Sequence, residues 1–170
     1  MKKLLLVTIL FLSSTFLFAQ DIINERYLPS TMVKTLDGKM VDIYDLVLAN
    51  DSMPVIVSFW ATWCKPCVSE LTTISDVYDD WRSESGVKLI AVSIDDVRTS
   101  ASVKPFVEGK AWNYDVVLDI NGDLKRAMNV NMVPHTFVLD GKGRIVWEHT
   151  SFSPGTEDEL IKIVWNIITR

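Results

Sequence analysis

The only two cysteines of this 170-residue chain, Cys64 and Cys67, are separated by two residues. The apolar run 55–60 precedes the pair, and a segment with helical spacing follows it from residue 65. A Cys-x-x-Cys pair at a strand-to-helix junction is typical of a dithiol–disulfide redox site. The helix N-terminus presents unpaired N–H groups and partial positive charge to the first sulfur, which favours its thiolate. The sequence therefore predicts a strand–turn–helix unit with a redox pair at its turn.

The two cysteines have different predicted tasks. Cys64 is the expected nucleophile, whose thiolate would attack a disulfide, and Cys67 would resolve the resulting mixed disulfide. The alternative is half of a zinc site, which would usually need two more ligands, and only His135 and His149 could supply them. Because the chain has no other cysteine, a framework of several structural disulfides is excluded.

The residues between the cysteines, Lys65 and Pro66, suit the start of a helix. Proline is tolerated in the first helical turn, where a missing N–H costs little. Lys65 adds positive charge near Cys64 and should favour the thiolate further, unless its ammonium is merely solvated. We expect both residues to border the place where a substrate binds.

Strand-like and helix-like segments alternate along the chain, which indicates an α/β protein. The expected strands cover residues 31–36, 39–41, 55–60, 87–94, 114–118, 136–139 and 145–148. The expected helices cover residues 43–48, 65–82, 102–108 and 124–128, with a last helix that runs to residue 168. Thr156 is expected to cap that last helix, with Glu159 completing a capping box.

The first 19 residues differ from the rest of the chain. Two lysines precede an apolar run over residues 4–19, and polar sequence begins at Gln20. A basic start, an apolar stretch and a small residue at Ala19 are typical of a signal peptide, and the run is short for a spanning helix. We expect a cleaved signal peptide at 1–19, with an uncleaved membrane anchor as the alternative, and one domain at 20–170.

The charge and the predicted export restrict the possible partners. The formal net charge of −5 argues against nucleic acid. A Cys-x-x-Cys pair as the only cysteines of an exported chain fits a catalytic pair outside the cytosol. We expect a periplasmic or other extracytoplasmic location, protein disulfides as substrates, and a monomer.

Around the cysteine pair the chain resembles the thioredoxin superfamily, and more narrowly the extracytoplasmic thiol–disulfide oxidoreductases of the TlpA/ResA type. The resemblance is carried by the run 63–67, Trp-Cys-Lys-Pro-Cys, and by the segment 133–140, Val-Pro-His-Thr-Phe-Val-Leu-Asp. It covers roughly residues 29–169. It implies a thioredoxin fold, in which helices flank a central mixed β-sheet, with an N-terminal β-hairpin and a central strand–helix insertion.

The resemblance also implies further site residues. Glu70 occupies the place of a buried glutamate that would have a raised pKa and shuttle a proton to or from Cys67. Without the resemblance, Glu70 would be read as an exposed helix residue. Pro134 would follow a cis peptide bond and present the backbone of Val133 to a substrate strand beside Cys64.

Three other positions near the motif are notable. Trp63 is expected in an apolar rim that receives a partner, whereas Trp60 is expected in the core. Ser58 stands where thioredoxin carries a buried aspartate. His135 replaces the usual threonine after the cis-proline. It could contact substrate, act as a nearby cation, complete a metal site with the two cysteines, or be a partly exposed strand residue.

The resemblance implies an enzyme that reduces disulfides of exported proteins, such as apocytochrome c before haem attachment. A membrane thiol–disulfide donor would re-reduce it, and it would need neither cofactor nor metal. The alternative is a Sco-like copper chaperone using Cys64, Cys67 and His135, although Sco proteins space their cysteines as Cys-x-x-x-Cys. A peroxiredoxin-like peroxidase is disfavoured, because that class carries Pro-x-x-x-Thr-x-x-Cys and Thr62 lies two residues before Cys64.

Overall fold

The computed structural model describes residues 25–169, in which strands and helices alternate as expected. The strands are β1 (Met32–Thr35), β2 (Met40–Asp42), β3 (Val55–Trp60), β4 (Lys88–Ser93), β5 (Asp115–Leu118), β6 (His135–Leu139) and β7 (Ile145–Thr150). The helices are α1 (Ile43–Leu48), α2 (Lys65–Ser85), the 3₁₀ turn η1 (Ser100–Ser102), α3 (Val103–Lys110), α4 (Asp123–Ala127) and α5 (Thr156–Ile168). The predicted signal peptide at 1–19 lies outside the described residues.

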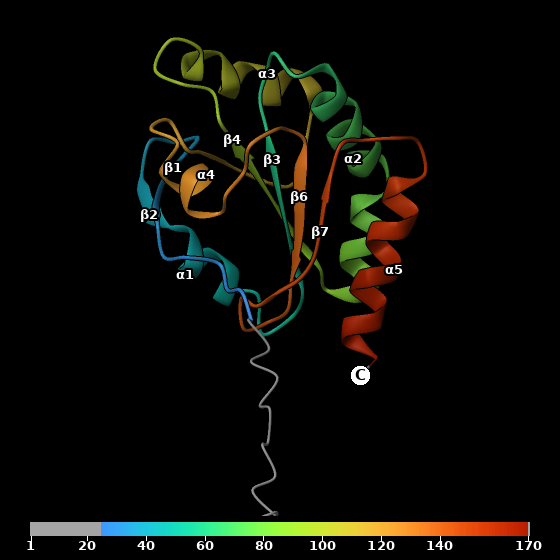
Figure 1. Ribbon diagram of the computed structural model, residues 1–170. Helices are drawn as coiled ribbons and strands as arrows, with labels where there is room; N and C mark the ends of the chain where they lie inside the picture. Colours follow the sequence, from blue (N-terminus) through green and yellow to red (C-terminus); the bar gives the residue numbers. More distant parts are fainter. Residues whose placement is uncertain (1–24, 170) are drawn as a thin grey trace, which may run out of the picture.

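The strands form one mixed sheet in the order β2-β1-β5-β4-β3-β6-β7 (Figure 1). β3 pairs parallel with β4 and antiparallel with β6, so it lies at the centre. All six of its residues are buried, as expected for a continuous apolar run covered on both faces. The predicted α/β class, the central mixed sheet, the N-terminal hairpin and the strand–helix insertion are confirmed.

Two apolar cores lie on the two faces of the sheet. One core joins β3 to α2, α3 and α5 and contains Trp60, Cys67 and Leu71. The other contains Phe59 and Phe137 and joins the sheet to α1 and α4. Successive strand residues point to opposite faces, so Phe59 and Trp60 belong to different cores. The expected burial of Trp60 is confirmed.

The order of the strands brings three loops together at one end of the sheet. Trp60, at the end of β3, is level with Ser93 at the end of β4, and Phe59 is level with His135 at the start of β6. The cysteine loop after β3, the loop after β4 and the turn before β6 therefore meet there. In Figure 1, α2 starts at this end and the described chain begins at the opposite end.

The long helix α2 ends three residues later than predicted. Trp81 and Ser85 are still buried, so the helix continues its contact with the core to that point. Gly86 then takes the left-handed conformation, with φ of 68°, and its N–H bonds the carbonyl of Arg82. This is the glycine C-cap that the sequence indicated.

The predicted capping box of the last helix is wrong. Gly155, with φ of 95°, occupies the cap position, and no side chain caps α5. Thr156 lies inside the helix, where its hydroxyl donates to the carbonyl of Ser153 at 2.7 Å. The left-handed glycine turns the chain one residue earlier than the Thr-x-x-Glu pattern suggested.

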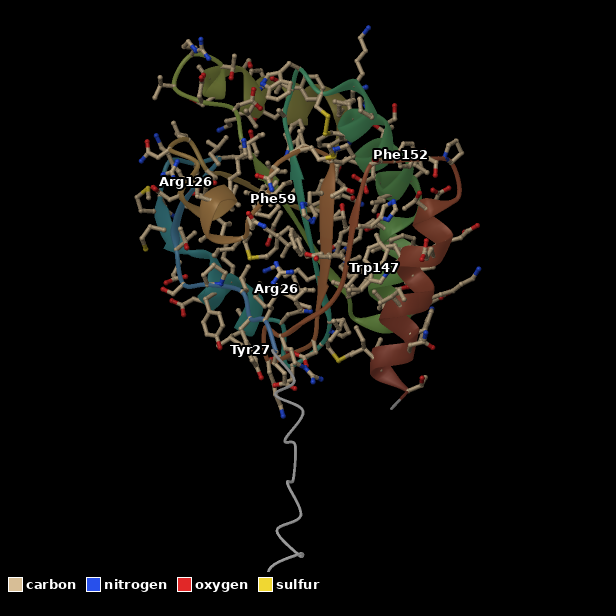
Figure 2. The ribbon with its side chains drawn as sticks, in the orientation of Figure 1. Arg26, Tyr27, Phe59, Arg126, Trp147 and Phe152 are labelled. Carbon is tan, nitrogen blue, oxygen red and sulfur yellow. A yellow bond between two sulfur atoms is a disulfide. The ribbon has the colours of Figure 1, made fainter. Side chains whose placement is uncertain are left out.

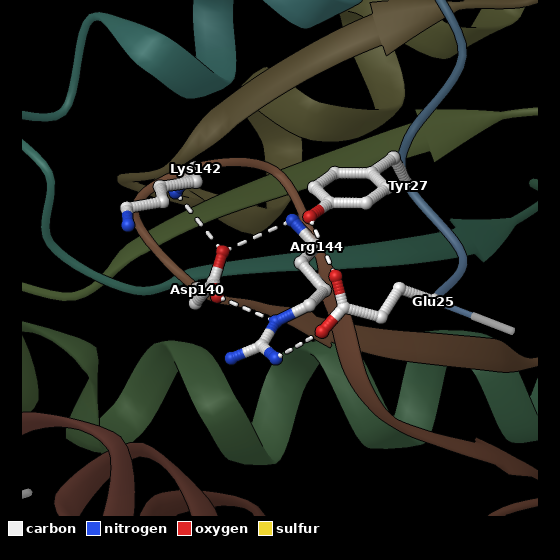
Figure 3. Close-up of polar contacts among 5 residues, drawn as sticks. All are labelled: Glu25, Tyr27, Asp140, Lys142 and Arg144. Atoms are coloured by element: carbon white, nitrogen blue, oxygen red, sulfur yellow. Dashed lines mark hydrogen bonds and ion pairs between the residues drawn. The ribbon is translucent and has the colours of Figure 1, made fainter. Parts of the chain in front are cut away.

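A polar cluster fixes the start of the described chain to the β6–β7 turn (Figure 3). Arg144 donates to Glu25 and to Asp140, both at 2.9 Å, and Tyr27 donates to Glu25 at 2.9 Å. A backbone bridge pairs Tyr27 with Arg144.

Within residues 25–169, no helix has the length and apolar character needed to cross a membrane.

Candidate redox site

Cys64 and Cys67 are joined by a disulfide at the first turn of α2. Cys64 is the N-cap residue, and its sulfur accepts a hydrogen bond from the Cys67 backbone N–H at 3.3 Å. Cys64 retains slight exposure, whereas Cys67 is fully buried. Lys65 and Pro66 form the first helical turn, as predicted. An attacking partner can therefore reach only the Cys64 sulfur.

The turn before β6 places its backbone beside the disulfide. The Val133–Pro134 peptide bond is cis, as the resemblance implied. The Cys64 sulfur lies 3.8 Å from the carbonyl oxygen of Val133. Trp63, Lys65 and Pro66 are exposed around it, with Trp63 61% exposed. The structure thus brings the predicted rim residues and the Val133 backbone together around Cys64.

Glu70 lies on the buried side of α2, under the cysteine turn, and is 3% exposed. Its Oε1 is 3.0 Å from the Thr136 hydroxyl, and its Oε2 is 3.5 Å from the Ser58 hydroxyl. Burial raises the pKa of Glu70 to about 7, and the two hydroxyls offset part of that rise. A carboxyl group that titrates near neutral pH can both accept and donate a proton.

Sequence reasoning missed both partners of Glu70. Ser58 and Thr136 face each other across β3 and β6, and their hydroxyl oxygens are 2.9 Å apart. The one available signal was the hydroxyl of Ser58 within an otherwise apolar run. The pairing register was needed to show that Thr136 lies opposite it.

A second buried carboxylate, Asp95, holds the loop that leads to the cysteines. It accepts hydrogen bonds from the Thr62 N–H at 2.9 Å, the Thr62 hydroxyl at 2.6 Å and the Ser93 hydroxyl at 2.8 Å. Asp95 is fully buried. The sequence indicated only a polar turn at this point. Its carboxylate fixes the backbone two residues before Cys64.

His135 lies on the face of the sheet opposite Glu70. It is 8% exposed and stacks on Phe137, with ring centroids 4.2 Å apart. Its Nε2 is 3.7 Å from Glu148, which Arg26 also contacts at 3.0 Å. Figure 2 shows Arg26 and Trp147 on opposite sides of β7.

The surroundings of His135 bear on two of its possible roles. Burial lowers the pKa of His135, which disfavours the charged ring that a cation beside Cys64 would need. It is also more buried than the partly exposed strand residue that the sequence allowed, because it packs on Phe137. Among the residues that the structure describes, no group of three or more His, Cys, Asp and Glu side chains is placed to hold a metal ion. The copper-chaperone alternative is therefore not favoured.

Glu70 gives a prediction about stability and pH. Its pKa in the folded protein is about 7, above the ordinary 4.5, so the folded state binds this proton more tightly than the unfolded chain. The contribution to stability is therefore present below about pH 4.5 and is lost as pH rises through about 7. At ~1.4 kcal/mol per unit of pKa difference, the loss amounts to about 3 kcal/mol.

Glu70→Gln removes this titration. We expect the oxidised wild-type protein to lose stability between about pH 5 and about pH 8, and the variant to lose about 2.5 kcal/mol less, because part of the loss has already occurred at pH 5. Urea unfolding at the two pH values measures the difference. The same pH dependence in both proteins would show that Glu70 titrates normally in the folded state.

The chain is similar in sequence to a known protein family and to several thiol-disulfide oxidoreductases. Residues 25–148 match the AhpC/TSA family. The sporulation thiol-disulfide oxidoreductase A of Bacillus subtilis is 29% identical over 164 residues, which are 94% of this chain and 94% of that protein. The thiol-disulfide oxidoreductase ResA of Bacillus thuringiensis is 31% identical over 120 residues, which are 71% of this chain but 65% of ResA.

Solved structures agree with the sequence relatives. A thioredoxin-like protein from Porphyromonas gingivalis is 48% identical, with a TM-score of 0.73 over 84% of this chain and 92% of its own. StoA from Bacillus subtilis is 27% identical, with a TM-score of 0.63 over 79% of this chain and 96% of its own. The thioredoxin fold that the family resemblance implied is confirmed.

Proposed function

Because this chain belongs to the AhpC/TSA family and is a thiol–disulfide oxidoreductase, we propose that Cys64 and Cys67 reduce disulfides in exported proteins. The observation that carries the proposal is the position of the Cys64 sulfur. It is the only accessible sulfur of the pair, it caps α2, and it lies 3.8 Å from the Val133 carbonyl beside a cis-proline.

The reaction begins from the reduced protein. The Cys64 thiolate attacks one sulfur of the substrate disulfide, a Cys64–substrate bond forms, and the other substrate sulfur leaves as a thiolate. Cys67 then loses its proton and attacks the Cys64 sulfur, which releases the second substrate thiolate. The substrate gains two electrons and the protein ends with the Cys64–Cys67 disulfide.

The α2 N-terminus stabilises Cys64 as the thiolate. The Cys67 N–H points at the Cys64 sulfur, and the helix dipole adds positive potential there. Lys65 is exposed one residue further on and adds a positive charge. These groups favour Cys64, and not the fully buried Cys67, as the sulfur that attacks first.

Glu70 acts as the proton acceptor for Cys67. Cys67 and Glu70 lie three residues apart in the first turns of α2, and both are buried. A carboxyl group with a pKa near 7 is half ionised at neutral pH, so it can take the Cys67 proton as that thiol attacks. Thr136 and Ser58 are positioning residues that hold the carboxylate in place.

The substrate segment lies across the cis-proline turn. The backbone of Val133 offers hydrogen bonds of the kind that join a strand to a sheet edge, which gives affinity without a fixed sequence. Trp63 supplies exposed apolar surface next to Cys64, and Pro66 is exposed in the same turn.

The protein works outside the cytoplasm as a monomer, after export by the segment 1–19. The pattern of that segment and the absence of cysteines other than the redox pair support this location. A membrane protein with a dithiol would return the Cys64–Cys67 disulfide to the reduced state. Reduction of apocytochrome c cysteines is one use that fits this arrangement.

The match to the AhpC/TSA family does not make a peroxiredoxin-like peroxidase more favourable than a disulfide reductase. A peroxide-reducing cysteine of that class follows a threonine by three residues, whereas Thr62 precedes Cys64 by two. The Thr62 hydroxyl also donates a hydrogen bond to the Asp95 carboxylate at 2.6 Å. It is therefore not directed at the Cys64 sulfur.

The reduction potential of the Cys64–Cys67 pair tests the proposed direction of electron flow. Equilibration in metal-free dithiothreitol or glutathione buffers is expected to give a value near or below ~−230 mV, as for a reductase with its own donor. A value near ~−120 mV would instead indicate an oxidant or isomerase.

A further inference from the structure

A cavity lies at the end of the sheet where the loop after β4 and the turn before β6 meet the cysteine loop. It has a volume of about 490 Å³ and lies between the loop after β4 and the helix α4. Its lining combines apolar side chains, such as Ile94 and Val130, with polar and charged ones, among them Asp96, Lys125 and Asn131.

Both walls of this cavity continue into the redox site. On one side, Asp96 follows Asp95, whose carboxylate holds Thr62 two residues before Cys64. On the other side, Asn131 lies two residues before Val133, whose carbonyl contacts the Cys64 sulfur. Each wall of the cavity is therefore joined, within one or two residues along the chain, to a residue that contacts the cysteine loop.

Among the charged side chains that line the cavity, the one without an ion-pair partner in residues 25–169 is positive. Arg126 is held by Asp123 at 2.6 Å, and Asp96 is held by Arg98 at 2.6 Å, so these charges are paired. Lys125 makes no ion pair with any residue between 25 and 169. Figure 2 shows Arg126 at the α4 side of the molecule.

The backbone of Lys125 is held in place, although its side-chain ammonium makes no ion pair with residues 25–169. Its backbone N–H donates to the buried carboxylate of Asp119 at 2.7 Å. The α4 turn therefore holds this lysine at the cavity rim. In a protein of net charge −5, an unpaired cation at the rim of this cavity favours an acidic group over a basic one.

Exposed apolar side chains lie in the cysteine loop, in the loop after β4 and in the turn before β6. Trp63 is 61% exposed, Val97 77% and Met132 59%. Trp63 precedes Cys64, Val97 follows Asp96 of the cavity, and Met132 follows Asn131. Large exposed apolar side chains grouped at a site indicate contact with a partner.

We propose that this cavity is a subsite selecting partner polypeptides that carry an acidic residue a few positions from the reacting cysteine, with apolar residues between them. The proposal rests on the disulfide-reductase function given above. An extended chain rises ~3.3 Å per residue, so three or four residues from the cysteine span about 10–13 Å. The apolar residues contact Met132 and Val97, and the carboxylate pairs with Lys125.

Two disulfide peptides of identical length test the subsite. One carries glutamate and the other lysine at the third and fourth positions on each side of its cysteines, with the same apolar residues between. The second-order rate constant for oxidation of the reduced protein is measured with each peptide. The readout is the ratio of the two rate constants, glutamate peptide over lysine peptide.

We expect the wild-type ratio to exceed one and to fall by about tenfold in Lys125→Glu, with a smaller difference at high salt. Lys162→Glu on α5 makes the same charge change at an exposed position of another helix, and we expect it to retain most of the wild-type ratio. Equal ratios in wild type and Lys125→Glu would overturn the subsite alone. Failure of the wild-type protein to react with either peptide would instead contradict the reductase function.

Discussion

Replacing Cys67 with serine is expected to stop turnover with Cys64 still bonded to its substrate. The variant keeps the sulfur that attacks but lacks the sulfur that resolves the mixed disulfide. The complementary variant, Cys64→Ser, is expected to form no such adduct, because the fully buried Cys67 is out of reach of a protein partner. Both variants should lose steady-state reduction of protein disulfides by on the order of 10³-fold or more.

The two cysteine variants are distinguished by what they trap. Non-reducing gels and intact mass measurement should show a stoichiometric adduct in Cys67→Ser and none in Cys64→Ser. Addition of dithiothreitol should release the substrate from the first variant. An adduct that forms as readily on Cys64→Ser would show that the order of the two sulfurs is reversed.

Replacing Glu70 with glutamine is expected to slow the resolving step by about 100-fold. The amide keeps the size of the side chain but cannot accept the Cys67 proton. In the wild type this step should accelerate as pH rises through about 7, because the Glu70 carboxylate becomes available. In the variant that acceleration should disappear.

Stopped-flow measurement of the second phase of substrate reduction, over a range of pH, tests this prediction. Glu84→Gln is the matched control, since it makes the same change at an exposed position of the same helix. A pH profile that is unchanged in Glu70→Gln would remove Glu70 from the proton transfer. Slowing in both variants would point to a general effect on α2.

The parts of the fold with strong local signals could be predicted from the sequence. The short apolar run of β3, rich in β-branched and aromatic residues, favours a strand buried on both faces, and the pattern after Cys64 has the spacing of an amphipathic helix. The Asp37-Gly38 turn gave the β1–β2 hairpin for the same local reason. Where two local signals competed, as at Gly155 and Thr156, the sequence alone pointed to the wrong cap.

The polar contacts inside the site depend on register and could not be predicted. Thioredoxin has its buried carboxyl group at the position of Ser58, on the central strand. Here the carboxyl group comes from Glu70 on α2, and Ser58 with Thr136 binds it from the sheet. That exchange requires β3 and β6 to pair with Ser58 opposite Thr136.

The contacts of Asp95 and His135 also could not be predicted from the sequence. An Asp-Asp pair after a strand reads as a turn, and nothing local shows that one carboxylate reaches Thr62 from a neighbouring loop. His135 follows Pro134 in sequence, but strand alternation points it away from the face that holds Glu70. Neighbours in sequence are therefore not neighbours in the site.

A single-turnover exchange measures the proposed reaction itself. The fully reduced protein is mixed with an equal amount of a protein disulfide, without metal or oxygen, and both products are identified by mass. We expect that one substrate disulfide is reduced for each Cys64–Cys67 disulfide formed, through an adduct on Cys64. A substrate disulfide that stays intact while the protein remains reduced would contradict the proposed reductase function.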